Sequence, residues 1–490
     1  MRITKIKLHN FRSFKGDFEI DLDSPIVSLV GENNTGKTTV FKALEFLKLG
    51  VEKGKTINDY KHINNQDDDV WVEVTIQGEN FENIISAFQG NTKYSSYIQK
   101  ENNLESIILK RSSEIKTIKQ GKKDIELNEK KICLYSDENK QFENPTGIDT
   151  AISSLLELIF VWSDMQTSDV ADFSSTKILG KLIKNISSQF FETDTWKKFE
   201  AAHKEAFKGD NSLSMLAADL TKDISSTFND FYGNATLELN FELPAADSFI
   251  KTGDVVLDDG MKTKLSEKGS GMQRAFALSV IKVYADSLAK HSKNKDLRKP
   301  LFFFIDEPEI SLHPRAQKLL INALQEISKH QQIFISTHSP YVISNFKSSE
   351  IKLLMIEKEN HESKVKEVNE LKTFSFSPTL AEINYFVYNV PTTDFHNELY
   401  GYIEQYEGSE YFKSPGEKLW IKQTKKGNQK EENFSLMYYI RNSIHHPENT
   451  SNTPYTAEEL NDSIKRMLQI IQSEEFQEKC NLDKSDSENE

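Results

Sequence analysis

The stretch with the clearest chemistry is the octapeptide at positions 31–38, Gly-Glu-Asn-Asn-Thr-Gly-Lys-Thr. It fits the pattern G-x-x-x-x-G-K-[ST], in which the backbone N–H groups of a glycine-containing loop surround phosphate oxygens. An apolar run at 25–30 precedes it and an apolar-periodic run at 39–47 follows, which predicts a strand, a loop and a helix. Lys37 is then expected to reach the β- and γ-phosphates of a nucleotide, and Thr38 to hold Mg²⁺. A chance match in a surface turn would not explain both flanking elements.

Two adjacent carboxylates follow a second apolar run. Residues 301–305 read Leu-Phe-Phe-Phe-Ile, and Asp306 and Glu307 come next. Ligands of open α/β sheets bind beyond the carboxyl ends of the strands, so we expect these acids beside the phosphates. Asp306 is a candidate to hold Mg²⁺ through water, and Glu307 is a candidate general base for an attacking water. A strand that simply ends in a solvated loop would not explain tandem acids after so apolar a run.

Two further polar clusters stand at the ends of expected elements. An apolar strand is expected at 333–335, and Ser-Thr-His-Ser follows it. A lone histidine is most often structural, but His338 falls on the same edge of the same expected sheet, which favours contact with the γ-phosphate. Gly269-Ser270-Gly271 precedes an expected helix from about 272 to 290, and would again offer N–H groups and a hydroxyl to an anion. On its own, this last loop is equally well explained as a flexible turn.

Taken in order, these motifs resemble those of the ABC-type ATPases of the SMC, RecF and OLD kind. Residues 31–38 are similar to the Walker A motif of that family, and residues 269–274 to its signature motif. Asp306 and Glu307 are similar to Walker B with its catalytic glutamate, and His338 to the switch histidine. The segment Asn-Phe-Arg-Ser-Phe at 10–14 resembles an N-terminal stretch of RecF-like and OLD-like members. The resemblance covers about residues 1–98 and 231–370.

This resemblance implies an α/β fold, a P-loop NTPase with an ABC-type head made of a mixed sheet and an antiparallel subdomain. It implies ATP hydrolysis, with ATP and Mg²⁺ as cofactors. In that family two heads sandwich ATP, so the signature of one chain would act in trans and the chain would form a dimer or a higher oligomer. The residues implied are Lys37, Glu307 and His338 for catalysis; Arg12, Gly31, Asn33, Asn34, Thr35, Gly36, Lys37, Thr38 and Thr39 for ATP; Thr38 and Asp306 for the metal; and Gly269, Ser270, Gly271 and Gln273 in trans.

Two details of this assignment stay open. From its position alone, Arg12 is equally a phosphate contact and a solvated turn residue. The Q-loop glutamine of the family has no clear match, and Gln66 is a weak candidate. The family's long coiled coil is not found, and no acidic TOPRIM nuclease pattern follows His338, so a separate partner would have to supply that nuclease chemistry.

The hydrophobic pattern predicts five segments. Alternating residues at 2–22 and 70–76 predict strands, so we place the N-terminal half of the ATPase head at 1–98. Residues 99–230 are expected to hold an antiparallel extension around 105–135 and a helical insertion from about 148, with helical runs at 155–162 and 196–207. Residues 231–370 form the second half of the head, with strands expected at 235–243 and 255–259. A helical C-terminal domain at 371–480 and a disordered acidic tail at 481–490 complete the chain.

The C-terminal segment contains a second candidate site. Arg441, Asn442 and His446 resemble the R-N-x-x-x-H motif of HEPN ribonucleases, in which an arginine and a histidine promote metal-independent attack by an RNA 2′-hydroxyl. The alternative is a capped helix end with hydrogen-bonded histidines, since Pro447 disfavours helical geometry at His446. Five lysines are expected to form a basic loop, which would be a local phosphate contact or simply solvated: Lys418, Lys422, Lys425, Lys426 and Lys430.

The order of the segments has a wider resemblance. An OLD-like core followed by residues 378–384, 395–402 and 441–449 looks like the OLD-like ATPases of bacterial anti-phage defence systems, for example the ATPase of PARIS systems. That resemblance implies an oligomer that holds a separate toxin or nuclease and releases it on sensing a phage.

Composition limits the classes of protein that fit. The chain has 490 residues, enough for two to four domains, and 61 Lys and Arg against 75 Asp and Glu, a net charge of −14. Any contact with nucleic acid must therefore be a local patch. The two cysteines, Cys133 and Cys480, do not suit a disulfide framework and favour a reducing compartment. We find no signal core and no apolar run of about 18 residues, so we expect a soluble cytoplasmic protein that does not bind membranes.

Three functions are compatible with these motifs. The main hypothesis is an ATP-hydrolysing switch of phage defence that controls a partner effector. The second is a self-contained ATPase-regulated ribonuclease that cuts with Arg441 and His446. The third is a RecF-like DNA-repair ATPase that clamps duplex DNA.

Overall fold

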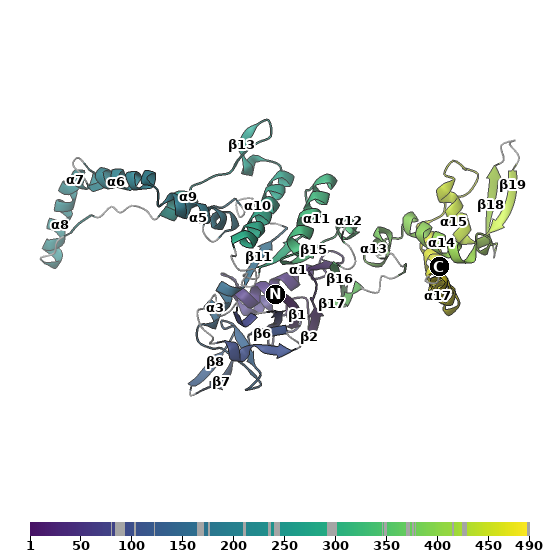
Figure 1. The fold of residues 1–490 in the computed structure, drawn as a ribbon, viewed down its shortest axis with the longest axis horizontal. Helices are drawn as coiled ribbons and strands as arrows, with labels where there is room; N and C mark the ends of the chain where they lie inside the picture. The colour runs from purple at the N-terminus through teal and green to yellow at the C-terminus, as the bar shows by residue number, and fades with distance from the viewer. Residues whose placement is uncertain are drawn as a thin grey trace. The chain divides into compact units, whose positions relative to one another are not determined.

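The structure, a computed structural model, divides the chain into two compact units (Figure 1). Unit 1 comprises residues 1–163, 292–309 and 317–490, and unit 2 comprises residues 164–291 and 310–316. The structure describes residues 1–79, 81–83, 94–101, 104–121, 123–163, 171–174, 177–208, 212–233, 237–239, 246–291, 301–344, 346, 350–368, 373–374, 377, 379–413, 416–423 and 429–487. Each unit is described by itself below.

A six-stranded sheet forms the centre of unit 1. Its order is β11 (Glu157–Val161), β14 (Leu301–Asp306), β15 (Gln332–Ser336), β3 (Ile26–Val30), β16 (Ile351–Glu359) and β17 (Glu362–Glu367). The first five strands are parallel and β17 is antiparallel to β16. Every residue of β3, β14 and β15 is buried, as expected for parallel strands covered on both faces. Polar side chains at the carboxyl ends of these strands therefore meet along one edge.

A second, antiparallel sheet packs against the same core. Its order is β10 (Gln141–Glu143), β9 (Cys133–Ser136), β6 (Leu104–Ser112), β4 (Trp71–Gly78), β1 (Arg2–His9) and β2 (Asp17–Asp21), and β5 (Gln99–Glu101) pairs with β6. Helix α1 (Lys37–Leu49) contributes Val40, Phe41 and Leu44 to a core shared with strands of both sheets. The mixed sheet and antiparallel subdomain predicted from the sequence are thus confirmed. Because β4 pairs with β6, the antiparallel sheet continues across residue 98.

The Gln332 side chain connects the two sheets at the start of β15. Its Oε1 atom accepts a hydrogen bond from the Ile3 backbone N–H at 2.7 Å. Its Nε2 atom donates to the carbonyl oxygens of Ile3 and Leu22, each at 2.9 Å, and to that of Ser24 at 3.1 Å. The amide is buried, and these partners satisfy both its acceptor and its donor group. A polar residue inside the core therefore fixes the first strands of the chain to the central sheet.

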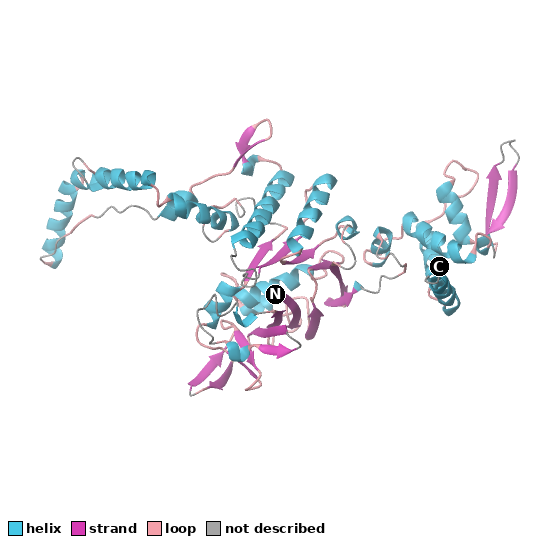
Figure 2. Ribbon diagram, viewed as in Figure 1, coloured by secondary structure: helices cyan, strands magenta, loops and turns pink. Residues whose placement is uncertain are grey.

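Unit 2 is largely helical (Figure 2). It holds α5 (Ile178–Phe190), α6 (Asp194–Lys208), α7 (Leu213–Leu216), α8 (Ala218–Tyr232), α9 (Ala246–Lys251) and α10 (Ser270–His291), with a hairpin of β12 (Val256–Asp258) and β13 (Lys262–Lys264). Ala277 and Val280 of α10 pack against Ile178, Leu179 and Leu182 of α5. Helix α6 confirms the helix predicted at 196–207, and β12 the strand near 255–259.

The C-terminal helices of unit 1 share a core of their own. α14 (Thr393–Glu407), α15 (Leu436–His445), α16 (Ala457–Ile471) and α17 (Glu474–Ser487) bury a cluster that includes Phe395, Ile440 and Ile464. Helix α13 (Leu380–Phe386) also adds a residue to this cluster, Ala381. Thr379 and Thr456 form capping boxes with Glu382 and Glu459, which satisfy the first N–H groups of α13 and α16. The helical C-terminal segment is as expected.

Three expectations differ from the structure. Residues 155–162 were expected to be helical, but Glu157–Val161 form β11 beside β14, because a short apolar run suits a buried strand as well as a helix. The lysine-rich stretch is not a loop but a hairpin of β18 (Lys418–Gln423) and β19 (Gln429–Phe434), with Lys422 opposite Lys430 (Figure 2). Lys425 and Lys426 lie outside the described residues.

The expected disordered tail begins too early, since α17 continues to Ser487. Glu and Lys are good helix formers, which lets a polar segment remain helical. Most of the strand expected at 235–243 and Pro378 lie outside the described residues. Both cysteines are free and buried. Within the described residues, no helix combines the length and the apolar character that crossing a membrane requires.

Candidate functional site

The loop at 31–36 joins β3 to α1 and depends on its two glycines. Gly31 has φ +140°, and a Cβ there would lie 2.2 Å from the carbonyl oxygen of Ile356. Gly36 has φ +112°, and a Cβ would lie 2.5 Å from the Ser363 hydroxyl. Asn34 also adopts a left-handed conformation, with φ +62°. Other residues are strained in these conformations, so the curl that turns backbone N–H groups toward an anion is built into the sequence.

Lys37 is the first residue of α1 and is buried. Its ammonium donates to the carbonyl oxygens of Gly31 at 3.1 Å and Glu32 at 2.8 Å. Burial lowers the pKa of Lys37 to about 8, although the carboxylates of Glu307 and Asp306 act in the opposite direction. The cation is therefore held against the loop with few compensating contacts, and an anionic ligand would stabilise its charged form.

The hydroxyl groups of three residues lie beside the Asp306 carboxylate at the end of β14. Ser336 of β15 donates to Oδ1, and the Thr38 hydroxyl lies 3.4 Å from the same atom. Ser163, which follows β11, donates to Oδ2 at 3.1 Å. Three strands and α1 thus hold a buried acid next to Thr38. This oxygen-only donor set fits Mg²⁺, which uses one or two protein oxygens and takes the rest from water and phosphate.

Glu307 and His338 lie together at the ends of neighbouring strands. The Nε2 atom of His338 is 3.2 Å from Oε1 of Glu307. Burial lowers the pKa of His338, and the Lys37 ammonium acts in the same direction, so the imidazole is neutral near pH 7 and donates its Nε2 proton. Glu307 has φ +46°, a strained conformation for a residue with a side chain. A carboxylate on a strained backbone, next to a neutral imidazole, is an arrangement suited to orienting a water molecule.

Ser363, near the start of β17, connects the phosphate loop to the segment at Ser13. The Ser363 hydroxyl donates to the carbonyl oxygen of Thr35, and its backbone N–H donates to that of Ser13 at 2.8 Å. The Ser13 hydroxyl is 3.3 Å from that of Thr39. Sequence analysis missed Ser163, Ser336 and Ser363, because single serines carry no pattern and become visible only through strand pairing.

The remaining expected ATP residues divide into two groups. Asn33 and Asn34 are exposed on the loop, as is Thr38 at the start of α1. Arg12 instead stacks on the Tyr60 ring, with its guanidinium carbon 5.6 Å from the centroid, and its backbone N–H donates to the Tyr60 carbonyl oxygen. Gln66 donates from its side chain to the carbonyl oxygen of His62, so it stabilises its own loop.

The expected signature residues belong to unit 2. Ser270 begins α10 and Gly271 follows it, and a Cβ on Gly271 would lie 2.4 Å from the carbonyl oxygen of Ser311. A Cβ on Gly269 would meet nothing within 4 Å. The Gln273 side chain donates to the carbonyl oxygens of Ser266 and Lys268, which closes the turn before the helix. Their role in trans remains a prediction.

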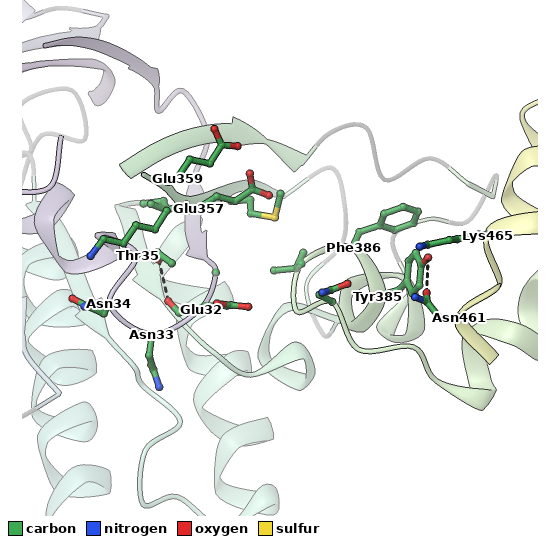
Figure 3. Close-up of a pocket in the computed structure, with 16 residues that line it drawn as sticks. Glu32, Asn33, Asn34, Thr35, Glu357, Glu359, Tyr385, Phe386, Asn461 and Lys465 are labelled. Carbon is green, nitrogen blue, oxygen red and sulfur yellow. Dashed lines mark hydrogen bonds between the residues drawn. The ribbon is translucent and has the colours of Figure 1, made fainter. Parts of the chain in front are cut away.

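A cavity of about 600 Å³ flanks the phosphate loop (Figure 3). Glu32, Asn33 and Asn34 line one side of it, and Tyr385 and Asn461, joined by a 3.1 Å hydrogen bond, line the other. Its described lining does not include Lys37, Thr38, Asp306 or Glu307. The cavity is thus distinct from the site around Asp306 and Glu307, and it borders the same loop on another side.

The second candidate site lies on α15 and just after it. The Arg441 guanidinium sits over the Tyr400 ring, 4.8 Å from its centroid, and 3.8 Å from a carboxylate oxygen of Glu404. Asn442 is buried, whereas His446 is exposed beyond the helix and lies 3.2 Å from Glu448. His446 has φ −126° and ψ 58°, so the helix ends there, outside the helical region that Pro447 disfavours for the residue before it. A ribonuclease role for these residues remains a prediction.

Comparison with known families decides the identity of the head. The model of the AAA ATPase domain matches residues 1–343, well over half of the chain. The chain belongs to the AAA ATPase domain family. The ATPase domain therefore includes the phosphate loop, Asp306, Glu307 and His338, and the predicted P-loop ATPase is confirmed at the level of the family.

Three curated relatives each match about 70% of the chain. The chain is 27% identical over 362 residues to the Old nuclease of Escherichia phage P2, and 24% identical over 368 residues to the endonuclease GajA of Bacillus cereus (strain VD045). These matches cover 70% of this chain and 57% and 56% of the relatives, so the chain spans little more than half of their length. It is 23% identical over 400 residues to the retron Vc95 probable ATPase of Vibrio cholerae serotype O1 biovar El Tor, covering 72% and 73% of the two chains.

Proposed function

We propose that this protein is an ATP-hydrolysing switch in which Glu307 orients and deprotonates the attacking water. The observation that carries the proposal is the 3.2 Å contact between Glu307 and His338 at the same sheet edge as Lys37 and Asp306. The backbone of Glu307 is in the left-handed region directly after β14, and the neutral imidazole lies beside one of its carboxylate oxygens. The other oxygen is then positioned to act as the base.

The remaining roles follow from the contacts around the loop. Lys37 neutralises charge on the β- and γ-phosphates, and the loop N–H groups with the N-terminus of α1 bind their oxygens. Thr38 and Asp306 would hold Mg²⁺, which supplies charge neutralisation of the triphosphate when bound. The hydroxyls of Ser163 and Ser336 keep the Asp306 carboxylate oriented toward Thr38.

We further propose that hydrolysis controls a separate effector in anti-phage defence, with two or more copies of the chain closing on ATP. The similarity to the Old nuclease, GajA and a retron ATPase supports this context. Unit 2 adds a structural argument. Helix α7 exposes Leu216 by 77%, and helix α8 exposes Leu220 by 57% and Phe231 by 79%. Exposed apolar rows of this kind are typical of surfaces that contact other proteins.

The test compares ATP turnover and nuclease activity for wild type, Glu307→Gln and His446→Ala. We expect Glu307→Gln to bind ATP with a Kd within about threefold of wild type and to lose at least about 100-fold in kcat, because the amide cannot accept the proton. We expect no variant to cleave RNA or DNA alone. Wild-type kcat retained in Glu307→Gln would refute the base. Metal-independent RNA cleavage lost only in His446→Ala would establish the ribonuclease instead.

A further inference from the structure

Glu309 bridges the two loops that carry the hydrolytic pair. It stands two residues after Glu307, and its Oε1 atom accepts the Thr337 hydroxyl at 2.6 Å and the His338 backbone N–H at 3.0 Å. Thr337 and His338 follow β15, whereas Glu307 and Glu309 follow β14. One carboxylate oxygen therefore fixes the spacing of the two loops, through charge-assisted hydrogen bonds that are stronger than neutral ones.

This contact determines where the His338 ring can reach. The backbone N–H of His338 is held by Glu309, and 3.2 Å separates its Nε2 atom from Glu307. A histidine side chain has only two rotatable bonds, so a shift of its backbone is passed directly to Nε2. The Oε2 atom of Glu309 is buried without a hydrogen-bond partner among the described residues, so its orientation rests on the two bonds made by Oε1.

A residue outside the matched ATPase domain reaches the same place. Tyr388 follows α13, and its hydroxyl lies 3.5 Å from the carbonyl oxygen of Thr337. Burial raises the pKa of Tyr388, and the Glu309 carboxylate adds to this effect, so the phenol keeps its proton and acts as a donor. The Thr337 residue is thus held by Glu309 through its side chain and by Tyr388 through its backbone.

We infer that Glu309 is a positioning residue for His338, and that Tyr388 couples this position to the C-terminal helices that follow the ATPase domain. The inference deepens the proposed function and rests on it, because it assigns the regulation of the same site. Movement of α13 would displace Tyr388, loosen Thr337 and withdraw the imidazole from Glu307. ATP binding by the phosphate loop should change less than turnover, since neither residue hydrogen-bonds to Lys37 or Thr38 among the described residues, although the Glu309 carboxylate acts to raise the pKa of Lys37.

Steady-state ATPase kinetics of four variants test the inference. Glu309→Gln keeps one acceptor oxygen, whereas Glu309→Ala keeps none. We expect Glu309→Ala to lower kcat at least about tenfold with KM within about twofold, and Glu309→Gln to recover most of the loss. Tyr388→Phe should lower kcat about threefold alone and should have no further effect in the Glu309→Ala background, since both residues act through Thr337. Equal losses in Glu309→Gln and Glu309→Ala, or additive losses in the double variant, would overturn the inference.

Hydrogen exchange separates this inference from the proposed function. The peptide covering 333–344 should exchange at least about tenfold faster in Glu309→Ala than in wild type, and at the wild-type rate in Glu309→Gln. If wild type hydrolyses no ATP and this pattern is still found, the proposed function fails and the positioning by Glu309 stands. If wild type is active and the peptide is equally protected in all variants, the positioning by Glu309 is refuted and the ATPase proposal is not.

Discussion

The buried His396 side chain makes the C-terminal helices sensitive to acid. It lies on α14 with no exposed surface, its Nε2 atom is 2.9 Å from the Ser463 hydroxyl of α16, and its Nδ1 atom has no hydrogen-bond partner among the described residues. Burial lowers its pKa to about 3; the neighbouring Asn397 side chain acts in the opposite direction and the Arg441 guanidinium in the same direction. The folded state therefore holds a neutral imidazole, whereas the unfolded chain titrates near its ordinary pKa of about 6.5.

The sign follows from proton counting. Below about pH 6.5 the His396 imidazole is protonated in the unfolded chain, whereas in the folded chain it stays neutral down to about pH 3. The free energy of unfolding therefore falls as the pH falls. Between pH 7.5 and pH 5 the expected loss from His396 alone is about 2 kcal/mol, obtained from RT ln(1 + 10^(pKa − pH)) with the unfolded pKa of about 6.5. This change corresponds to a roughly 30-fold increase in the open population of the helices.

Hydrogen exchange on peptides covering 393–407 and 457–471 measures this population at both pH values, after correction for intrinsic exchange rates. His396→Gln cannot titrate and keeps a polar atom for Ser463, so its opening free energy should lose about 2 kcal/mol less than wild type on acidification. The exposed His445 provides the matched control, and His445→Gln should behave as wild type. If wild type and His396→Gln lose the same free energy, burial of a neutral His396 is the wrong explanation.

Three other variants or conditions test the loop and the core. Gly36→Ala should weaken ATP binding at least about tenfold in titration calorimetry. The loop would have to change shape, because residue 36 has φ +112° and the new Cβ would lie 2.5 Å from the Ser363 hydroxyl. Gly401→Ala is the control and should bind ATP as wild type does, because its Cβ meets nothing within 4 Å. Since Lys37 loses its proton near pH 8, ATP affinity should fall about tenfold per pH unit above that value, and binding at pH 9 should take up a proton, seen as heat that depends on the buffer. Burial raises the pKa of Cys133 to about 11, so its reaction with a disulfide reagent at pH 8 should be at least about 100-fold slower in the native chain than in urea, whereas equal rates would contradict its burial.

The ATPase head could be predicted from the sequence because its functional residues occur in short motifs of a few consecutive positions. Each motif is recognisable from a few consecutive residues, as in the loop at 31–38, the tandem acids at 306–307 and the cluster at His338. The parallel sheet then brings their strands together. Local pattern failed at 155–162, where a strand of five residues is as apolar as one face of a helix. Only pairing with β14 decides between a strand and a helix, and a partner strand 144 residues away in the sequence leaves no local signal.

The supporting residues could not be predicted for a related reason. Ser163, Ser336 and Ser363 act through partners brought close by strand pairing, and serine is common in loops of any kind. Sequence analysis did not single out Glu309, because its role depends on a backbone N–H of the loop after the next strand. Tyr388 lies in a segment whose fold alone, and not its composition, places it beside Thr337.

The pairing of β3 with β15 and β16 has a consequence for synthesis of the protein. β3 is complete by residue 30, but both of its neighbours come from residues 332–359. At roughly 5–20 residues per second a ribosome needs about 15 to 60 seconds to make the intervening stretch of about 300 residues. Throughout that interval a strand in which four of the five residues are apolar has both edges unpaired, and Ile3 lacks the Gln332 amide that anchors it. We therefore expect the nascent head to need chaperones, and a fragment released by a ribosome that stalls before residue 332 to be prone to aggregation.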